Sequence, residues 1–447
     1  MSRATAAPST AGAPPVAARA GARPPVPGPT GVATAFPRSS GALGSALEGT
    51  PGRMRVLGFV GALVAAVFGL VGAMSLWSSA GALERAAHNT AQVVRIQGIY
   101  ADLVRADADG TNSFLVGGIE DPAKRADYDA SMDRVAKGIS SAAEAQPADS
   151  EALGVLNGKI QAYVTTVEQA RVYNRQGVPV GATYLSNASA SLRSEALPIV
   201  KSLVDANKAR ADAEFDAASR LLTLILVGLA SLAVLVLVMV WLARRTHRYL
   251  NASLFVGTLV VLAALAVGII TLAGVGSQVQ AVRNTDFLYT VKLADARTAA
   301  YDAKSNESLT LIARGSGSQY DAAWQQQSAS LLTSLASLDD ATENRLKGEW
   351  QTYVDAHNAI RAEDTSGNWD AAVQKALDTG PDSANAKFTA FTNDADATLG
   401  RYSAETQASL LGPVTWVTVL GWLLLVLCVG AAFLVLRGMG QRIEEYR

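Results

Sequence analysis

The sequence predicts an all-α membrane protein with four transmembrane helices and two extracytoplasmic four-helix bundles from an internal duplication. Three observations predict this fold. Four apolar runs, at 56–77, 221–243, 252–275 and 413–436, each exceed 20 residues and contain no charged residue or histidine, and about 20 helical residues cross a bilayer core. The long segments that follow the first and third runs have helical periodicity. Both of these segments also contain the same nine-residue motif.

Residues 1–54 are predicted to form a disordered cytoplasmic tail. They are rich in Ala, Pro and Gly, most densely in the stretch "GAPPVAARAGARPPVPGP". This composition cannot bury a core. The tail is therefore either a spacer or a docking segment, and the spacer is the favoured interpretation.

The first transmembrane helix is predicted at 55–78. A signal peptide is the alternative, but the apolar run is too long for one and 55 residues precede it. In this span Gly61, Ala65, Gly69 and Ala73 recur every four residues, a row of small residues that lets two membrane helices pack closely. Membrane helices are rich in Gly and Ala in any case, and the sequence does not say which helix the row would contact.

Residues 79–219 are predicted to form the first bundle. Ile96, Ile99, Leu103, Ala106 and Gly110 have the three-to-four spacing of one apolar helix face, which predicts a helix over 82–116. Glycines at 117–118 and the Asp-Pro pair at 121–122 suit a helix end and a new helix start. Further helices are expected at 123–145 and 150–176, and after a turn at 177–183 a fourth helix, kinked at residue 198, leads back to the membrane.

The second and third spans are predicted at 220–243 and 252–275, with a short loop at 244–251 between them. This loop contains Arg244, Arg245 and Arg248, and positive charge in short loops stays on the cytoplasmic side. The arginines are therefore candidate contacts for a cytoplasmic partner. The prediction is a multi-pass protein of the cell membrane with both termini in the cytoplasm.

The second bundle is predicted at 276–412, followed by the fourth span at 413–436 and a cytoplasmic tail at 437–447. Helices are expected at 280–314, 319–338 and 341–363, and a Gly-Pro pair at 380–381 interrupts the fourth. The two bundle segments are acidic, with 14 basic and 18 acidic residues at 78–219 and 11 and 18 at 276–412. The whole chain has a net charge of −1, which gives no basic field for nucleic acid.

The repeated motif reads "LNGKIQAYV" at 156–164 and "LKGEWQTYV" at 346–354, identical at five of nine positions. Together with the matching order of helices and spans, it indicates a duplicated span–bundle–span unit. Its apolar positions have core spacing, and Gly158 and Gly348 would let a neighbouring helix approach. The alternative is a ligand-facing pair, Tyr163 and Tyr353, but core packing is favoured.

Polar residues near the outer ends of the first helices are the candidate contacts for an external ligand or partner. They are Arg105, Asp109 and Asn112 in the first bundle and Asn306 at the matching place in the second. A solvated helix end is the alternative and is favoured, because Asn and Asp are common at helix ends.

The sequence excludes several functions. The spans contain no Asp, Glu, Lys, Arg or His, which disfavours transport. No nucleophile elbow, phosphate-binding loop or zinc-protease motif is present, so we expect no enzyme. One cysteine and three scattered histidines offer no metal site, and no cofactor is expected. Two hypotheses remain: a transmembrane signal transducer, or a structural or accessory membrane protein such as an envelope scaffold or transporter subunit. Membrane lipids would surround either kind of protein, and the sequence leaves open whether the chain forms a homodimer.

Two resemblances favour the transducer. The bundle segments resemble the four-helix sensor domains of bacterial chemoreceptors, although the chain lacks their HAMP and signalling segments. The stretch "IQGIYADLVRADADGTNSFLVGG" at 96–118, together with the doubled bundle and minimal cytoplasmic parts, resembles the GlnX family of four-span membrane proteins of actinobacteria. That resemblance implies relay of a glutamate- or aspartate-like signal from an extracytoplasmic amino-acid-binding lipoprotein to a cytoplasmic Ser/Thr kinase.

Overall fold

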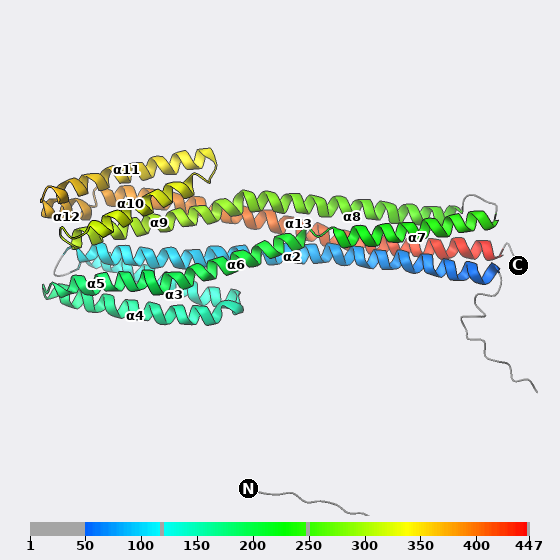
Figure 1. The fold of residues 1–447 in the computed structure, drawn as a ribbon, viewed down its shortest axis with the longest axis horizontal. Coiled ribbons are helices and arrows are strands. Elements are labelled where there is room, and N and C mark those ends of the chain that lie inside the picture. The colour runs from blue at the N-terminus through cyan, green and yellow to red at the C-terminus, as the bar shows by residue number, and fades with distance from the viewer. Residues whose placement is uncertain (1–49, 117–119, 247–250, 445–447) are drawn as a thin grey trace, which may run out of the picture.

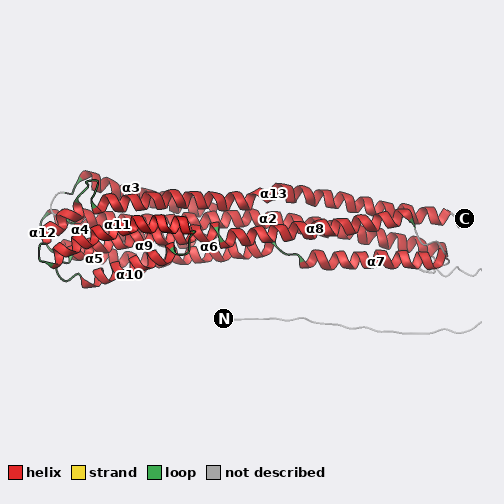
Figure 2. Ribbon diagram, turned by 90° about the horizontal axis from the view of Figure 1, so that it is seen from above, coloured by secondary structure: helices red, strands yellow, loops and turns green. Residues whose placement is uncertain are grey.

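The computed structural model describes residues 50–116, 120–246 and 251–444. All regular secondary structure in these residues is helical (Figures 1 and 2). The helices are α2 (Thr50–Phe114), α3 (Pro122–Ala145), η1 (Pro147–Asp149), α4 (Ser150–Arg175), α5 (Val180–Ser191), η2 (Leu192–Ala196), α6 (Leu197–Ala218), α7 (Leu222–Thr246), α8 (Ala252–Asn284), α9 (Asp286–Ile312), α10 (Ser318–Leu335), α11 (Asp340–Thr365), α12 (Trp369–Leu377) and α13 (Ala384–Glu444). The predicted all-α class is confirmed.

The molecule is an elongated rod with a bundle end and a span end (Figure 1). At the bundle end α2 to α6 form a first bundle, and α9 to α12 with the start of α13 form a second beside it. Towards the span end only α2, α7, α8 and α13 continue, and each belongs to a helical stretch long and apolar enough to cross a membrane. Four candidate spans are therefore confirmed, whereas a common origin of the two units stays a prediction.

Two helices run from the bundles to the span end without a break. They are α2, with 65 residues, and α13, with 61 residues and Pro413 in its interior. The other two paths are interrupted, at 219–221 between α6 and α7 and at Thr285 between α8 and α9. The prediction of one helix over 280–314 was therefore wrong, because Thr285 has a ψ of −95° that ends the helical ladder.

The row of small residues on α2 lies within the packed group of spans. A Cβ on Gly69 would stand 2.4 Å from the Cβ of Cys428 on α13, and one on Gly61 would stand 3.1 Å from Val435. Ala65 and Ala73 are fully buried. This row therefore packs against a helix of the same chain.

The motif in each bundle lies in the core, as favoured from its spacing. Tyr163 on α4 and Tyr353 on α11 are both buried, as are the leucines of both copies. Gly158 and Gly348, in contrast, face open space. The expectation that they allow a close helix approach was wrong, because the apolar stripe of each helix lies on the face opposite its glycine.

The last helical segment of the first bundle, formed by α5 and α6, contains a single π turn, η2, just before Pro198. The N–H of Leu197 bonds to the carbonyl of Leu192, five residues earlier. A proline has no N–H and cannot continue the normal ladder, and π turns often occur at functional positions. This turn carries Arg193 towards the second bundle.

Candidate functional site

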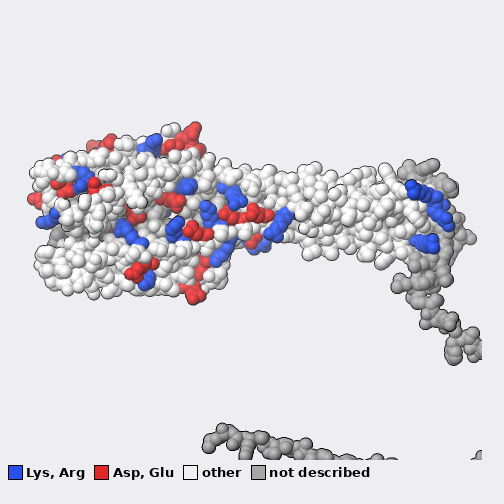
Figure 3. Space-filling view, in the orientation of Figure 1, with Lys and Arg blue, Asp and Glu red and all other residues white. Residues whose placement is uncertain are grey.

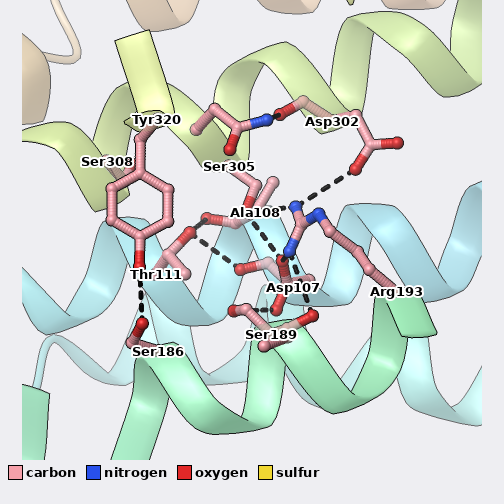
Figure 4. A network of polar contacts seen from close by, with 12 residues as sticks. Asp107, Ala108, Thr111, Ser186, Ser189, Arg193, Asp302, Ser305, Ser308 and Tyr320 are labelled. Atoms are coloured by element: carbon pink, nitrogen blue, oxygen red, sulfur yellow. Dashed lines mark hydrogen bonds and ion pairs between the residues drawn. The ribbon is translucent and has the colours of Figure 1, made fainter. Parts of the chain in front are cut away.

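The two bundles meet at a cluster of buried polar side chains near the bundle end (Figure 4). We call this cluster the polar seam. Its members come from α2, α4, α5 and η2 of the first bundle and from α9 of the second. They are Asp107, Tyr163, Ser189, Arg193, Asp302 and Ser305.

Asp107 is the centre of the seam and has no exposed surface. Its Oδ1 accepts hydrogen bonds from the hydroxyls of Ser189, at 2.6 Å, and Tyr163, at 3.3 Å. Its Oδ2 accepts from Ser305 of the second bundle at 2.7 Å and pairs with Arg193 at 3.0 Å. Both oxygens are thus occupied, and one carboxylate ties together three helices of its own bundle and one of the other.

Arg193 is the cation of the seam and bridges the two bundles. Besides Asp107, its guanidinium donates to Asp302 at 3.1 Å and to the hydroxyl of Ser305 at 3.0 Å, both on α9. The fork of the guanidinium can address several acceptors at once. Its side chain is 28% exposed, so water reaches one side of the seam.

Burial and charge act against each other in this cluster. Burial alone would lower the pKa of Arg193, but the carboxylates of Asp107 and Asp302 outweigh it and raise that pKa further. Burial raises the pKa of Asp302, and the nearby Arg193 offsets part of this. The seam is therefore held by two carboxylates that share one guanidinium, and removing any one charge unbalances the others.

Two further hydrogen bonds join the bundles. The hydroxyls of Ser186 on α5 and Tyr320 on α10 lie 2.5 Å apart, also seen in Figure 4. Gln97 on α2 donates to the carbonyl of Val291 on α9 at 3.5 Å. These contacts extend the polar connection in both directions from the seam.

The sequence-predicted residues of the first bundle lie on α2 beside the seam but are not its centre. Arg105 lies 3.9 Å from Asp109, and its guanidinium carbon lies 5.7 Å from the ring centre of Tyr301 on α9. Asp109 accepts from Ser131 at 3.3 Å. Burial raises the pKa of Asp109 to about 6, although Arg105 opposes this shift.

The two asparagines are buried, so the favoured expectation of a solvated helix end was wrong. Asn112 donates to Asn385 on α13 at 3.4 Å, and Asn306 donates to the carbonyl of Asp302 in its own helix at 2.8 Å. The reason is the contact between the bundles: α9 and α13 cover the end of α2, and α2, α10 and α13 surround α9.

The predicted cytoplasmic contacts lie at the opposite end of the molecule. Arg244 and Arg245 are exposed in the last turn of α7, and Arg248 lies outside the described residues. On the face shown in Figure 3, charges of both signs cover the bundles, the middle of the rod has none, and only basic side chains appear at the span end.

A second buried charge cluster lies inside the second bundle. Glu307 on α9 accepts from Lys304 at 2.6 Å and from Tyr353 of the motif at 3.1 Å, and its Oε2 lies 2.7 Å from Nδ1 of His357. The ring of Trp324 stacks on His357 at 3.8 Å. Burial alone would raise the pKa of Glu307, but Lys304 and His357 lower it to about 2.

Sequence reasoning missed Asp107 and Arg193, although one signal was present. Asp107 follows Leu103 by four residues and so lies on the apolar face of its helix. A carboxylate in that place requires a partner. Arg193 had no comparable signal, because its position depends on the π turn.

A hollow of about 320 Å³ opens at the bundle end of the first bundle. Arg171, on its wall, pairs with Glu120 at 3.2 Å and Glu168 at 2.7 Å. The other lining residues are Ser113, Phe114, Pro122, Arg125, Asn174 and Arg175. Within the described residues, no group of three or more His, Cys, Asp and Glu side chains could hold a metal ion.

The first bundle matches the model of a known protein family. Residues 82–216 match the family model of the actinobacterial sensor domain. This range runs from the bundle part of α2 almost to the end of α6 and includes Asp107, Tyr163, Ser189 and Arg193. No curated protein and no solved structure matches the chain. The match indicates a sensing or signalling role for an actinobacterial membrane protein.

Proposed function

We propose that this chain is a transmembrane signal transducer in which a stimulus on the bundles changes their contact at the polar seam. The observation that carries the proposal is the path of α2. One unbroken helix contributes Asp107 to the seam and also runs through the spans to the span end. A rotation or shift of α2 at the seam would therefore move its opposite end.

The packing between α2 and α13 supports transmission over this length. The rings of Trp77 and Trp422 lie 4.5 Å apart, and Trp77 donates to the carbonyl of Thr418 at 3.2 Å. With Gly69 against Cys428, this contact makes the two continuous helices one unit. The breaks between α6 and α7 and at Thr285 make the other two connections between bundles and spans less rigid.

The finer proposal concerns the signal and its receiver, and it rests on the GlnX resemblance. The bundles lie outside the cell and report an amino-acid signal delivered by a solute-binding lipoprotein, and basic residues at the span end contact a cytoplasmic Ser/Thr kinase. The proposed input site is the hollow at the bundle end. Ser113, on its wall, lies on α2 only six residues after Asp107. The chain itself has no catalytic step.

The rival is a static scaffold or accessory subunit. One observation favours it: both oxygens of Asp107 are fully paired, and a satisfied buried network rigidifies a structure. The two functions differ in whether the seam and the span end move together.

Distances between spin labels test this difference in the full-length protein in nanodiscs, with Cys428→Ala as background. One label pair is placed at the exposed Gln161 and Gln351, on the two bundles, and a second at Arg53 and Ala252 near the span end. The added probes are glutamate, aspartate and a glutamate-loaded solute-binding lipoprotein. A probe that shifts both distance distributions supports the transducer.

A ligand-free arm keeps the test independent of the signal's identity. Asp107→Ala unbalances the seam and should shift the Arg53–Ala252 distribution without any probe. If this variant changes the bundle pair but leaves the span-end pair as in the parent, the seam is not coupled to the spans and the proposed transmission is wrong. If neither the probes nor the variant moves either pair, the scaffold is the better account.

A further inference from the structure

A groove lies between α2 and α7 at the span end, far from the polar seam. Its volume is about 640 Å³, within the range of roughly 300–1,000 Å³ that ligand sites occupy. Its walls are apolar side chains of both helices, and Arg244 and Arg245 of the last turn of α7 lie at its mouth. The other lining residues are Leu57, Val60, Val234, Leu237, Val238, Val240 and Trp241.

Among the side chains that the structure describes, those that carry charge around the groove are all basic. Within the described side chains of the four spans and their span-end turns, every charged residue near this end is an arginine, including Arg53 and Arg55 on α2. Neither Arg244 nor Arg245 has a carboxylate partner among the described residues, and both are exposed. The two arginines at the mouth of the groove therefore favour a ligand with an anionic group.

The dimensions of the groove match one leaflet of a membrane. From Val234 to Arg244 the helix advances ten residues, or about 15 Å at 1.5 Å per residue. This is about half the thickness of a 30 Å hydrocarbon core. A molecule that fills the groove would thus have an apolar tail as long as a leaflet is deep and an anionic head at its surface. Trp241, half-buried on the wall, has an amphipathic ring suited to that depth.

We propose that the groove binds one anionic phospholipid, with its phosphate on Arg244 and Arg245 and an acyl chain along Leu237 and Val234. Basic pockets between transmembrane helices recognise such headgroups. The lipid would fill the space beside α2, the helix that reaches the seam. The proposal requires only that the spans lie in a bilayer and does not depend on sensing.

Native mass spectrometry of the full-length protein in detergent tests the proposal, because only lipid held at a specific site remains bound. Phosphatidylglycerol and phosphatidylcholine are titrated onto the parent and onto Arg244→Gln/Arg245→Gln. Each basic residue near an anionic headgroup is worth about fivefold, so the double variant should weaken phosphatidylglycerol binding roughly 25-fold. Binding of phosphatidylcholine should not change.

The matched control is Arg53→Gln/Arg55→Gln, which removes the same charge at the same end outside the groove and should change the affinity less than twofold. Leu237→Trp, at a side chain that is largely exposed, fills the groove without disturbing the core and should also abolish binding. Thermal unfolding of each variant verifies that it is folded.

Three outcomes would overturn the proposal: equal affinity for the two lipids, an equal loss in both arginine pairs, or unchanged binding in Leu237→Trp. Glycerol 3-phosphate in excess separates the sources of the phosphate. Full competition by this headgroup alone would show a small-anion site and would contradict the lipid assignment, whereas the lipid site should retain its adduct.

Discussion

The replacement of Asp107 by asparagine is the sharpest test of the polar seam. The amide keeps the shape of the side chain and one acceptor oxygen, so the contacts with Ser189 and Tyr163 can persist. The other oxygen becomes an NH₂ group that faces Arg193, and a guanidinium has only donors. The variant therefore loses a charge-assisted contact made at 3.0 Å and places two donors against each other.

The expected cost follows from the geometry. Breaking a buried ion pair by removing one partner costs about 3–5 kcal/mol. Arg193 keeps Asp302 at 3.1 Å, and its side chain is 28% exposed, so the lower end, about 3 kcal/mol, is expected. The control is Asp205→Asn, which removes an exposed i, i+4 pair with Lys201 and should cost about 0.5 kcal/mol or less.

Urea unfolding of the purified chain in mild detergent, followed by circular dichroism, measures both costs. A loss for Asp107→Asn no larger than that of the control would refute the seam as a buried, paired network. A second arm uses Arg193→Gln, which leaves Asp107 and Asp302 as neighbouring carboxylates. Since protonation of one relieves their repulsion, the loss of stability should be larger at pH 8 than at pH 5.

Three further predictions concern other parts of the molecule. The pKa of Glu307 is lowered to about 2, so its contribution to the free energy of unfolding is complete above about pH 4.5 and is lost as pH falls towards 2. Glu307→Gln should remove this pH dependence in urea titrations and should cost about 3 kcal/mol of stability at pH 7. The pKa of Asp109 is raised to about 6, so its contribution to stability is lost as pH rises from about 4 to 6. In urea titrations the parent should lose stability relative to Asp109→Asn over this range, and a difference between the two proteins that does not change with pH would contradict the shift. Gly69→Ala should destabilise the spans by about 1–3 kcal/mol because its Cβ meets Cys428, and thermal unfolding in detergent should show recovery on adding Cys428→Gly but not Cys428→Ala, which keeps the Cβ.

The spans and most helix boundaries could be predicted because they depend on local signals. Uninterrupted apolar runs define the spans, and an Asp-Pro start defines α3, where Asp121 accepts from the N–H of Ala123 at 2.9 Å. The core position of Tyr163 and Tyr353 followed from spacing alone. In each case the information lies within a few turns of one helix.

The seam could not be predicted, because the rule that polar residues face water fails where helices surround one another. In α9 every residue from 299 to 311 is buried, although this stretch includes Asp302, Lys304, Ser305, Asn306 and Glu307. Such a stretch has the composition of an exposed helix. Only the arrangement of α2, α10 and α13 around α9 makes it internal, and that arrangement depends on contacts between residues about 200 positions apart.

The polar character of the seam also indicates where the molecule can change its shape at low cost. The bundles share an apolar cluster, which on the span side of the seam includes the buried alanines at 296, 299 and 300 of α9, and separating that surface would expose hydrocarbon to water. At the seam, by contrast, Asp107 and Arg193 belong to one bundle and would stay paired. Only the contacts of Arg193 with Asp302 and of Asp107 with Ser305 would open, and hydration of the parted groups would offset much of the loss because a buried ion pair contributes little net stability. The bundles should therefore part first at the bundle end while the alanine contact stays closed. Such a motion tilts α2 about the alanine contact, and a helix that is unbroken from Asp107 to the span end must then shift at its other end.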